Sequence, residues 1–226
     1  MPDMSPRDQI LAGIRRSLGR PRIEGEQAEA LTRRLDNSQS NLVPKRSQIP
    51  HAEQVDLFVA MAEGVQTTVT RVATEADVPG AVADYLKQHN LPAELRLAPD
   101  DWLTGLPWES RSMLTIRTGR AEEPDPVSVT PAFAGVAETG TLMLTSGPKT
   151  PTTLNLLPET HMVVLKASQI VGAYEEGWTK LRAAYPAQLP RTMNYITGPS
   201  RTGDIEQKIL MGAHGPQRLH VVLIDD

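Results

Sequence analysis

A glutamate in a turn of small residues is the first candidate for chemistry in this chain. The segment AGVAETGTLMLTS places Glu138 beside Gly140, between two short predicted strands. A carboxylate in such a turn can act as a nucleophile, as a general base or as an acceptor for a substrate hydroxyl. We therefore take Glu138 as a candidate catalytic residue, and Thr139, Gly140 and Thr141 as candidate ligand-binding residues. The alternative is an exposed turn residue, which is the commoner position of a lone glutamate.

A second candidate is an anion site in the segment NYITGPSRTGDIE. We expect a strand to end there in a tight turn and a helix to follow over residues 200–211. The free N–H groups and the positive end of such a helix favour a bound anion, and Arg201 adds a guanidinium that suits a carboxylate or a phosphate. The alternative is that the hydroxyls only cap the helix while Arg201 pairs with a carboxylate of the same turn. The candidate ligand-binding residues here are Gly198, Ser200, Arg201, Thr202 and Asp204.

The histidines and Lys149 are weaker candidates. His214 lies in the segment GAHGP, at the far end of the expected helix from Ser200, so we interpret it as a structural or interface residue. His161 begins a predicted buried strand, where a histidine usually has its hydrogen bonds satisfied. Lys149 can offer its charge to an anion, or can simply be exposed to solvent. The spacing of histidines and carboxylates matches no metal-ligand set, so we expect no metal, and we expect no cofactor.

Strand and helix patterns alternate along the rest of the chain, and these elements must position the candidate residues. Helical spacing of apolar residues predicts helices that start near His51, Asp77 and Ser168. The alternation is typical of an α/β fold with an open, largely parallel sheet and helices on both faces. Loops that follow parallel strands gather at one edge of the sheet, where ligands bind, so we expect both candidate segments at that edge. The predicted strands cover residues 67–72, 94–97, 113–117, 127–130, 134–137, 141–145, 161–166, 194–197 and 218–224.

The first part of the chain is expected to precede the main domain as an arm. Ser5 can cap a helix, and Pro6 suits the first helical position. An apolar face with flanking arginines then predicts a short amphipathic helix that docks either on its own domain or on a partner. Residues 21–50 are polar and poor in pattern, which is typical of a linker. We therefore divide the chain into residues 1–50, an N-terminal helix and polar linker, and residues 51–226, the domain.

Composition excludes several classes of protein. The chain has 226 residues, a formal net charge of −4 and no cysteine. Without cysteine it has no disulfides, no thiol nucleophile and no cysteine-ligated zinc or iron–sulfur site. Mild acidity argues against a nucleic acid partner. There is no apolar run as long as a transmembrane helix, and the start lacks a signal-peptide layout, so we expect a cytoplasmic protein without membrane insertion.

Several motifs in one order carry a family resemblance. The segments AGVAETGTLMLTS, LLPETHMVVL, ITGPSRTGDIE and GAHGPQRLHVVLID resemble those of the lactate-utilisation protein C family, the LUD-domain proteins. The resemblance is strong from Thr130 to Asp226 and weak from His51 to Thr130. Gly203 is a departure, because the family is expected to carry alanine there, in the pattern SRTADIE. Glycine weakens a helix start by about 0.5–1 kcal/mol.

The resemblance implies a fold, a pathway and partners. The implied fold is similar to that of the sugar-phosphate isomerase and coenzyme A transferase superfamily. The implied role is in the oxidation of L-lactate to pyruvate, within a multi-subunit complex whose iron–sulfur subunits carry the electrons. The absence of cysteine in this chain agrees with such a division of labour.

Two functional hypotheses follow. In the first, the chain is a non-redox component of L-lactate utilisation that binds a small carboxylate or phosphate anion, or a partner subunit, at the sheet edge. In the second, it is a free-standing enzyme of acyl-transfer or sugar-phosphate type, in which Glu138 is the nucleophile or base and Arg201 holds the anion. Whether the chain is catalytic on its own stays open at this point.

Overall fold

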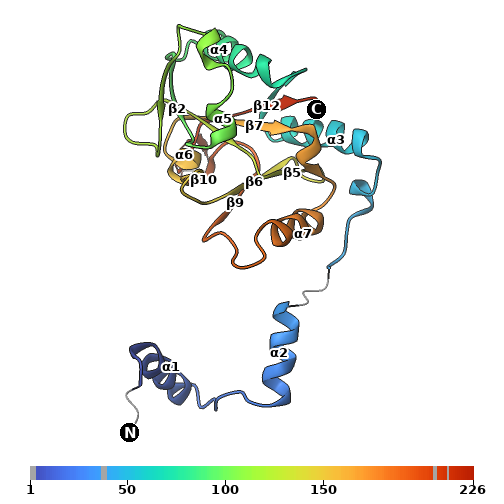
Figure 1. Ribbon diagram of the computed structural model, residues 1–226, viewed down its shortest axis with the longest axis vertical. Coiled ribbons are helices and arrows are strands. Elements are labelled where there is room, and N and C mark those ends of the chain that lie inside the picture. The colour runs from blue at the N-terminus through green and yellow to red at the C-terminus, as the bar shows by residue number, and fades with distance from the viewer. Residues whose placement is uncertain (1–3, 37–39, 206–207, 213) are drawn as a thin grey trace. The chain divides into compact units, whose positions relative to one another are not determined.

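The chain forms two compact units, residues 1–42 and residues 43–226. The computed structural model describes residues 4–36, 40–205, 208–212 and 214–226 (Figure 1). In the described part of the chain, helices are too short or too polar to cross a membrane.

The first unit contains two helices. Helix α1 (Pro6–Ser17) begins as predicted, with the Ser5 hydroxyl oxygen accepting the backbone N–H of Asp8. Helix α2 (Glu26–Asp36) lies in the stretch that we expected to be a linker. Its charges suit the helix dipole, since acidic residues occupy the first turn and arginines the last turn. This charge pattern explains a helix where the apolar pattern was weak.

The second unit alternates strands with helices. Its helices are η1 (Lys45–Ser47), α3 (His51–Gly64), η2 (Glu75–Asp77), α4 (Val78–Gln88), α5 (Asp101–Thr104), η3 (Trp108–Ser110), α6 (Thr153–Leu156), η4 (Ala167–Gln169) and α7 (Tyr174–Ala184). Its strands are β1 (Thr68–Val72), β2 (Glu94–Leu97), β3 (Thr115–Thr118), β4 (Val127–Pro131), β5 (Ala134–Val136), β6 (Thr141–Thr145), β7 (Thr160–Lys166), β8 (Ile170–Val171), β9 (Met193–Ile196), β10 (Arg201–Ile205), β11 (Lys208–Met211) and β12 (Arg218–Ile224).

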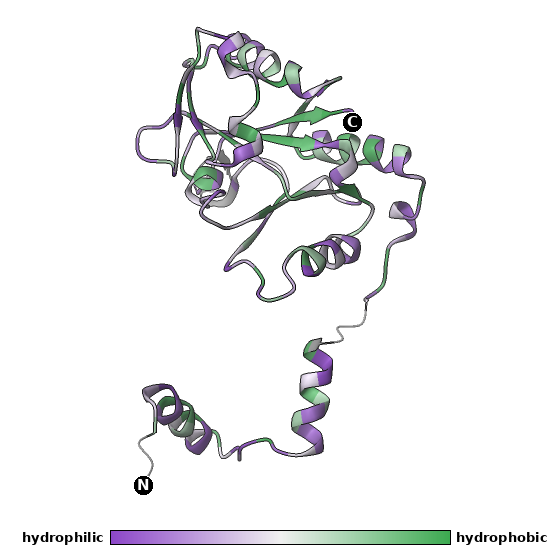
Figure 2. Cartoon of the chain, viewed as in Figure 1, coloured by the Kyte–Doolittle hydropathy of each residue, from purple (hydrophilic) through white to green (hydrophobic). Residues whose placement is uncertain are grey.

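The main sheet has six strands in the order β1-β12-β7-β4-β2-β3. Every neighbouring pair in it is parallel. Together with the helices that flank it, this sheet confirms the predicted α/β fold class. Its central strands β7 and β12 are among the most hydrophobic segments of the chain (Figure 2), as expected for strands that are buried on both faces.

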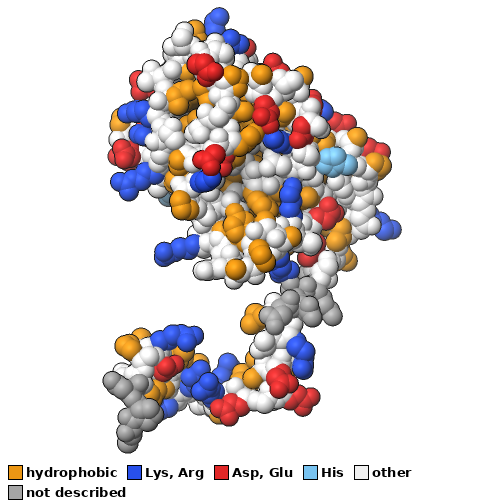
Figure 3. All heavy atoms as spheres, in the orientation of Figure 1, with side chains coloured by type: hydrophobic (Ala, Val, Ile, Leu, Met, Phe, Trp, Pro, Cys, Tyr) orange, Lys and Arg blue, Asp and Glu red, His pale blue; other side chains and the backbone are white. Residues whose placement is uncertain are grey.

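Alternate residues of the central strands pack into two separate hydrophobic cores. Met162 and Val164 of β7 pack with α4 and the tryptophan-containing segment after β2. Val163 and Leu165 of the same strand pack with α3 and the second sheet. Successive side chains of a strand point to opposite faces, so one strand serves both layers. Acidic and basic side chains are interspersed on the face of this unit that Figure 3 shows, so its charge there favours no single class of partner.

A second sheet, which the sequence did not predict, covers one face of the first. Its four strands lie in the order β8-β5-β6-β9. Strands β5 and β6 form an antiparallel hairpin, β9 adds to β6 in antiparallel orientation, and β8 adds to β5 in parallel. We had predicted three of these strands singly, but their pairing joins segments far apart in the sequence.

The helix expected over residues 200–211 is wrong. Strands β10 and β11 pair there as an antiparallel hairpin, with Arg201 opposite Met211 and Thr202 opposite Leu210. The β-branched residues of this stretch and Gly203 within it lower its helix propensity. No helix N-terminus therefore follows Ser200 to attract an anion.

The helix expected from Ser168 also begins later than predicted. Ile170 and Val171 form β8, and α7 starts at Tyr174. Ser168 bonds Asp226 instead, with its hydroxyl 2.6 Å and its amide nitrogen 2.8 Å from the carboxylate oxygens. Ser168 thus bonds the last residue of the sequence, Asp226, instead of capping a helix as predicted.

A buried ion pair links strand β2 to the loop before β4. Arg96 donates two hydrogen bonds to Asp125, at 2.8 and 3.1 Å, and the backbone N–H of Glu122 donates a third, at 2.7 Å. The Asp125 side chain is 4% exposed and that of Arg96 11%. Burial alone would raise the pKa of Asp125, but the bonds from Arg96 and Glu122 outweigh burial and lower it.

Asp125→Asn should lower the free energy of unfolding by about 3 kcal/mol, because it leaves the buried Arg96 charge with only the exposed Glu122 carboxylate, 3.8 Å away, as a counter-ion. Urea unfolding followed by tryptophan fluorescence at neutral pH measures the loss. The stability that Asp125 contributes is present above its usual pKa of 3.8 and is lost as the pH falls from there through its lowered folded pKa. Asp56→Asn is the control, since Asp56 pairs with Arg71 on the surface and its removal should change little. Equal effects of the two variants would contradict this account.

Candidate functional site

Glu138 is buried in the β5–β6 turn and caps a helix. Its side chain is among the buried polar groups, with 5% exposed. One carboxylate oxygen accepts the N–H of Tyr174, the first residue of α7, at 3.2 Å, and its own N–H donates to the Gly172 carbonyl at 3.0 Å. A negative group at a helix N-terminus is favourable. The geometry therefore gives Glu138 a structural role.

A cluster of hydroxyls joins the two predicted segments. The Thr141 Oγ1 lies 2.7 Å from the Thr139 hydroxyl, 2.8 Å from the Tyr174 hydroxyl and 2.6 Å from the Thr197 hydroxyl. Thr197 directly follows β9, which ends at Ile196, and precedes Gly198. The β5–β6 turn and the segment after β9 are thus held side by side by Thr197 and Tyr174, neither of which was a predicted site residue.

Two glycines bring both segments against the end of α3. Gly140 and Gly198 have φ angles of +64° and +79°. A Cβ at Gly140 would overlap the backbone of Ala62, and one at Gly198 would lie 2.5 Å from the Val65 carbonyl oxygen. Only a residue without a side chain fits such an approach. Arg201 reaches the same helix end, where its guanidinium donates to the Val65 carbonyl at 3.4 Å.

A pocket of about 200 Å³ lies beside this junction. It opens at the amino ends of β7 and β12, because His161 and Leu219 are the second residues of those strands. The expectation that the candidate segments meet at the carboxyl edge of the parallel sheet is therefore wrong. The lining residues are Asn155, Leu156, His161, Tyr195, Ile196, Thr197, Gly198, Pro199, Ser200, His214, Gly215, Pro216 and Leu219.

The backbone of Ser200 closes the base of the β10–β11 hairpin. Its N–H donates to the Pro216 carbonyl at 2.9 Å, and its carbonyl accepts the N–H of Gly212 at 3.0 Å. His214, Gly215 and Pro216 thus line the same pocket as Ser200. We had expected His214 at the opposite end of a helix, and the hairpin corrects that placement.

His161 and Tyr195 both line the pocket, and each carries a buried polar atom. His161 is fully buried, and burial lowers its pKa to about 3, so its ring is neutral at physiological pH. Its Nε2 lies 2.8 Å from the Thr130 hydroxyl. Among the described residues neither its Nδ1 nor the Tyr195 hydroxyl has a hydrogen-bond partner. His161 was predicted to be a core histidine with its bonds satisfied; it is a core histidine, but only one of its nitrogens is satisfied within the described chain.

The pocket can hold a small polar ligand by hydrogen bonds. Burial, followed by the neighbouring Tyr174, raises the pKa of Tyr195, so its hydroxyl stays protonated and can donate. The His161 Nδ1 donates or accepts according to which nitrogen carries the hydrogen, and Ser200 can do both. The described residues contain no group of three or more histidines, cysteines or carboxylates that could hold a metal ion.

Other predicted residues lie outside this pocket or outside the described side chains. Thr202 and Asp204 belong to β10, and their side chains are outside the described part of the structure. Lys149 lines a different hollow of about 450 Å³, at the carboxyl edge of the main sheet. Its ammonium pairs with Asp101, and Lys166 in the same hollow pairs with Glu75 at 2.6 Å. Both cations are thus already neutralised by carboxylates.

The fold and the pocket define an α/β domain with an open parallel sheet, an added mixed sheet and a pocket of about 200 Å³ at the amino edge. Residues 126–224 match the LUD domain family model. This part of the chain is therefore similar to the LUD domain, and it contains every lining residue of the pocket.

Individual proteins also resemble this chain in sequence or in structure. The protein named YkgG of Escherichia coli K12 is 27% identical over 236 residues, which are 99% of this chain and 100% of YkgG. Lactate utilization protein C of Halalkalibacterium halodurans is 33% identical over 109 residues, so the alignment spans 47% of this chain and 47% of that protein. The crystal structure of a DUF162 family protein from Deinococcus radiodurans has the same fold, with a TM-score of 0.58 and 24% identity over 78% of this chain and 99% of that one.

Gly140→Ala should destabilise the second unit by about 3 kcal/mol, because the new methyl group meets the backbone of α3 and the φ angle is positive. Gly64→Ala is the matched control at the end of the same helix, where a Cβ meets nothing within 4 Å. The control should be neutral or slightly stabilising, since alanine is the better helix former. Thermal unfolding of both variants checks the contact, and a Gly140→Ala protein as stable as wild type would refute it.

The free energy of unfolding should fall on acidification below pH 6.5. Burial lowers the pKa of His161 to about 3, and burial and His89 lower that of His220 to about 4. Between these values and 6.5 the unfolded chain binds protons that the folded chain does not, so each histidine removes about 1.4 kcal/mol per pH unit. Urea unfolding at pH 7, 6 and 5 measures the slope. His220→Gln should remove roughly half of this contribution, and an unchanged slope in that variant would contradict the assignment.

Proposed function

We propose that this chain is a cytoplasmic, non-redox component of L-lactate utilisation that binds a small carboxylate, lactate or pyruvate, in the pocket beside Ser200. The observation that carries the proposal is that two residues lining that pocket, His161 and Tyr195, each carry a buried polar atom, the Nδ1 and the hydroxyl, without a partner among the described residues. Such atoms are costly unless a ligand or water bonds them.

The chemistry of the pocket suits a 2-hydroxy or 2-oxo acid. The Tyr195 hydroxyl and Ser200 can donate to a carboxylate, while the neutral His161 ring can bond either a hydroxyl or a carbonyl at the neighbouring carbon. Without a buried cation in the lining, the ligand would be held by hydrogen bonds rather than by an ion pair. Modest affinity follows, because such bonds contribute little net free energy each.

The role in lactate utilisation rests on the relatives and on composition. The name of the Halalkalibacterium halodurans relative is lactate utilization protein C. Oxidation of lactate to pyruvate releases two electrons and two protons, and a chain without cysteine cannot pass electrons through a cysteine-ligated cluster. We therefore propose that iron–sulfur partner subunits accept the electrons, and that this chain binds the organic acid or the partner.

The alternative, a free-standing acyl-transfer or sugar-phosphate enzyme, needs Glu138 to reach a substrate. Its carboxylate instead accepts the N–H of Tyr174 and is buried. No observation on the described residues favours that alternative. Glu138→Gln should therefore weaken the cap of α7 without changing lactate affinity.

Two tyrosine variants separate binding from folding. Tyr195→Phe removes a hydroxyl without a partner among the described residues, so it should leave the melting temperature unchanged or raise it, yet weaken binding of L-lactate or pyruvate by about 3–10-fold. Tyr174→Phe removes a hydroxyl bonded to Thr139 and Thr141, so it should lower stability by about 1–2 kcal/mol and leave affinity within about two-fold. Titration calorimetry and thermal unfolding measure both.

Absence of binding by the wild-type protein, or equal affinity of Tyr195→Phe, would overturn the assigned pocket. The pathway role is tested separately. A deletion strain should fail to grow on L-lactate as sole carbon source, and a tagged full-length chain should recover iron–sulfur proteins from lactate-grown cells. Growth of the deletion strain at the normal rate would end the pathway proposal, whatever the calorimetry shows.

A further inference from the structure

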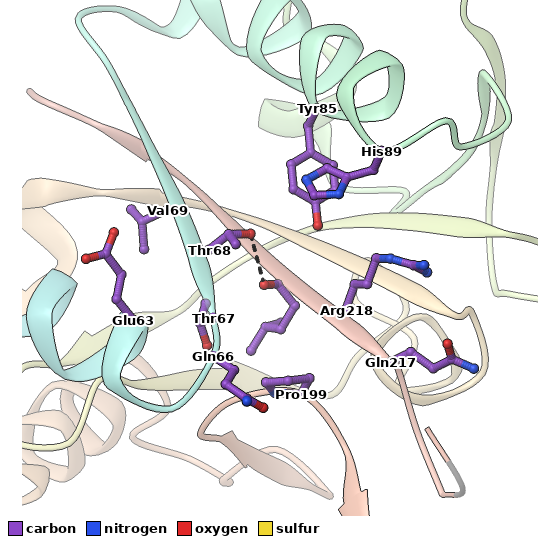
Figure 4. Close-up of a pocket in the computed structure, with 11 residues that line it drawn as sticks. Glu63, Gln66, Thr67, Thr68, Val69, Tyr85, His89, Pro199, Gln217 and Arg218 are labelled. Atoms are coloured by element: carbon purple, nitrogen blue, oxygen red, sulfur yellow. Dashed lines mark hydrogen bonds between the residues drawn. The ribbon is translucent and has the colours of Figure 1, made fainter. Parts of the chain in front are cut away.

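A second, larger cleft lies next to the candidate pocket. It has a volume of about 730 Å³ and is bounded by the end of α3, the start of β1, α4 and the start of β12 (Figure 4). It shares only Pro199 and Leu219 with the pocket beside Ser200. Pockets for small metabolites are typically of about 300–1,000 Å³, so this cleft has room for more than a three-carbon acid.

Gln66, an exposed residue that lines this cleft, has an unfavourable backbone conformation. Helix α3 ends in a Schellman motif, in which the N–H of Thr67 donates to the Ala62 carbonyl at 3.0 Å and that of Gln66 to the Glu63 carbonyl at 2.9 Å. The motif puts Gln66 at φ 69°, where glycine is the usual residue. Strain of this kind is concentrated at functional sites. The side chain that glycine would lack lines the cleft.

Thr67 contributes a buried hydroxyl that nothing in the described chain bonds. The residue is 3% exposed, and its Oγ1 has no partner among the described residues. Its neighbour Thr68 differs, because its hydroxyl lies 2.8 Å from the His220 Nδ1. A buried, unsatisfied hydroxyl on a cleft calls for a ligand group or an ordered water.

The rest of the lining is rich in hydrogen-bond donors. Tyr85 is held between the rings of His89 and His220, at centroid distances of 4.2 and 4.0 Å, and Figure 4 shows its hydroxyl pointing toward the cleft. Arg218 brings a guanidinium that forms no ion pair with the described residues, and Gln217 brings an amide. The Glu63 carboxylate lies on the side of the cleft away from Arg218 (Figure 4) and can accept hydrogen bonds from hydroxyl groups.

We infer that this cleft binds a small polyhydroxylated anion, a sugar acid or a sugar phosphate. Arg218 takes the anionic group, and Thr67, Gln66 and Tyr85 bond its oxygens. Glu63 accepts from its hydroxyls. This site does not depend on lactate binding beside Ser200, because no polar lining residue is common to the two hollows.

Calorimetry with D-gluconate, D-glucose 6-phosphate and neutral D-glucitol tests the inference on the full-length protein. At least one anion should bind, and D-glucitol should bind at least about ten-fold more weakly, because it lacks the group that Arg218 holds. The two anions distinguish a carboxylate site from a phosphate site. Equal affinity for D-glucitol, or no binding of either anion, would overturn the proposal.

Matched variants tie the binding to named atoms. Thr67→Val keeps the shape and removes the unbonded hydroxyl, so it should keep the melting temperature and weaken the anion by about 3–10-fold. Thr68→Val removes the bond to His220, so it should lower the melting temperature and leave affinity unchanged. Arg218→Gln should abolish the preference for anions over D-glucitol, whereas Arg71→Gln, at the far end of β1, should not. Identical behaviour of the two threonine variants would refute the site.

Gln66→Gly gives an independent check. Glycine relieves the positive φ angle, so the variant should melt at a higher temperature, while the loss of the amide weakens the anion by about 3–10-fold. Stabilisation without any loss of affinity would show that Gln66 has no part in binding. Tyr195→Phe should leave the affinity for these anions unchanged, which separates a failure of this cleft from a failure of the pocket beside Ser200.

Discussion

The end of helix α3 is the physical constraint on which both hollows depend. Two turns, at Gly140 and Gly198, approach its backbone so closely that neither tolerates a side chain. The Val65 carbonyl accepts from Arg201, and the next two residues line the larger cleft. One helix terminus thus fixes the second sheet, the segment after β9 and the start of β1 relative to one another.

The chain path explains why these hollows lie at the amino edge of the parallel sheet. Strand β7 ends at the carboxyl edge of the main sheet, where β8 follows. A parallel β12 must begin at the amino edge, so the intervening segment has to cross back before Arg218. Strand β9, in the second sheet, makes that return, and the turn at Ser200 comes directly after it. The candidate residues therefore precede a strand of the main sheet rather than follow one.

Local patterns predicted the strands well and their partners poorly. The bounds of β2, β6 and β12 agree with the apolar patterns of the sequence, because each pattern depends on burial alone. The sequence of the β10–β11 hairpin predicts a helix instead, because Ser200 and the acidic residues after it resemble a helix start. In the structure Arg201 pairs with Met211 across the hairpin. A pattern read over a few neighbouring residues does not show such cross-strand pairing.

In the candidate site, too, local features were predictable from the sequence and tertiary contacts were not. Gly140 and Gly198 were predicted as candidate ligand-binding residues, and the structure shows that both closely approach the backbone at the end of α3. The Glu138 carboxylate looked reactive because the sequence does not show that the N–H of Tyr174 lies 3.2 Å away. Tyr195 and Thr197 carry no motif signal, and their importance comes from tertiary contacts alone. A rule that segments just before a buried parallel strand gather at the amino edge would have placed Ser200 and His214 together.

The two backbone bonds of Ser200, to Pro216 and Gly212, have an evolutionary consequence. They join the two ends of the β10–β11 hairpin, its neck, through main-chain atoms only. These bonds therefore do not depend on which side chains the hairpin carries. Insertions, deletions and rapid sequence drift in that hairpin leave the pocket wall intact. Among homologues, length variation can therefore accumulate between residues 201 and 211 while the residues on either side of the neck stay in register.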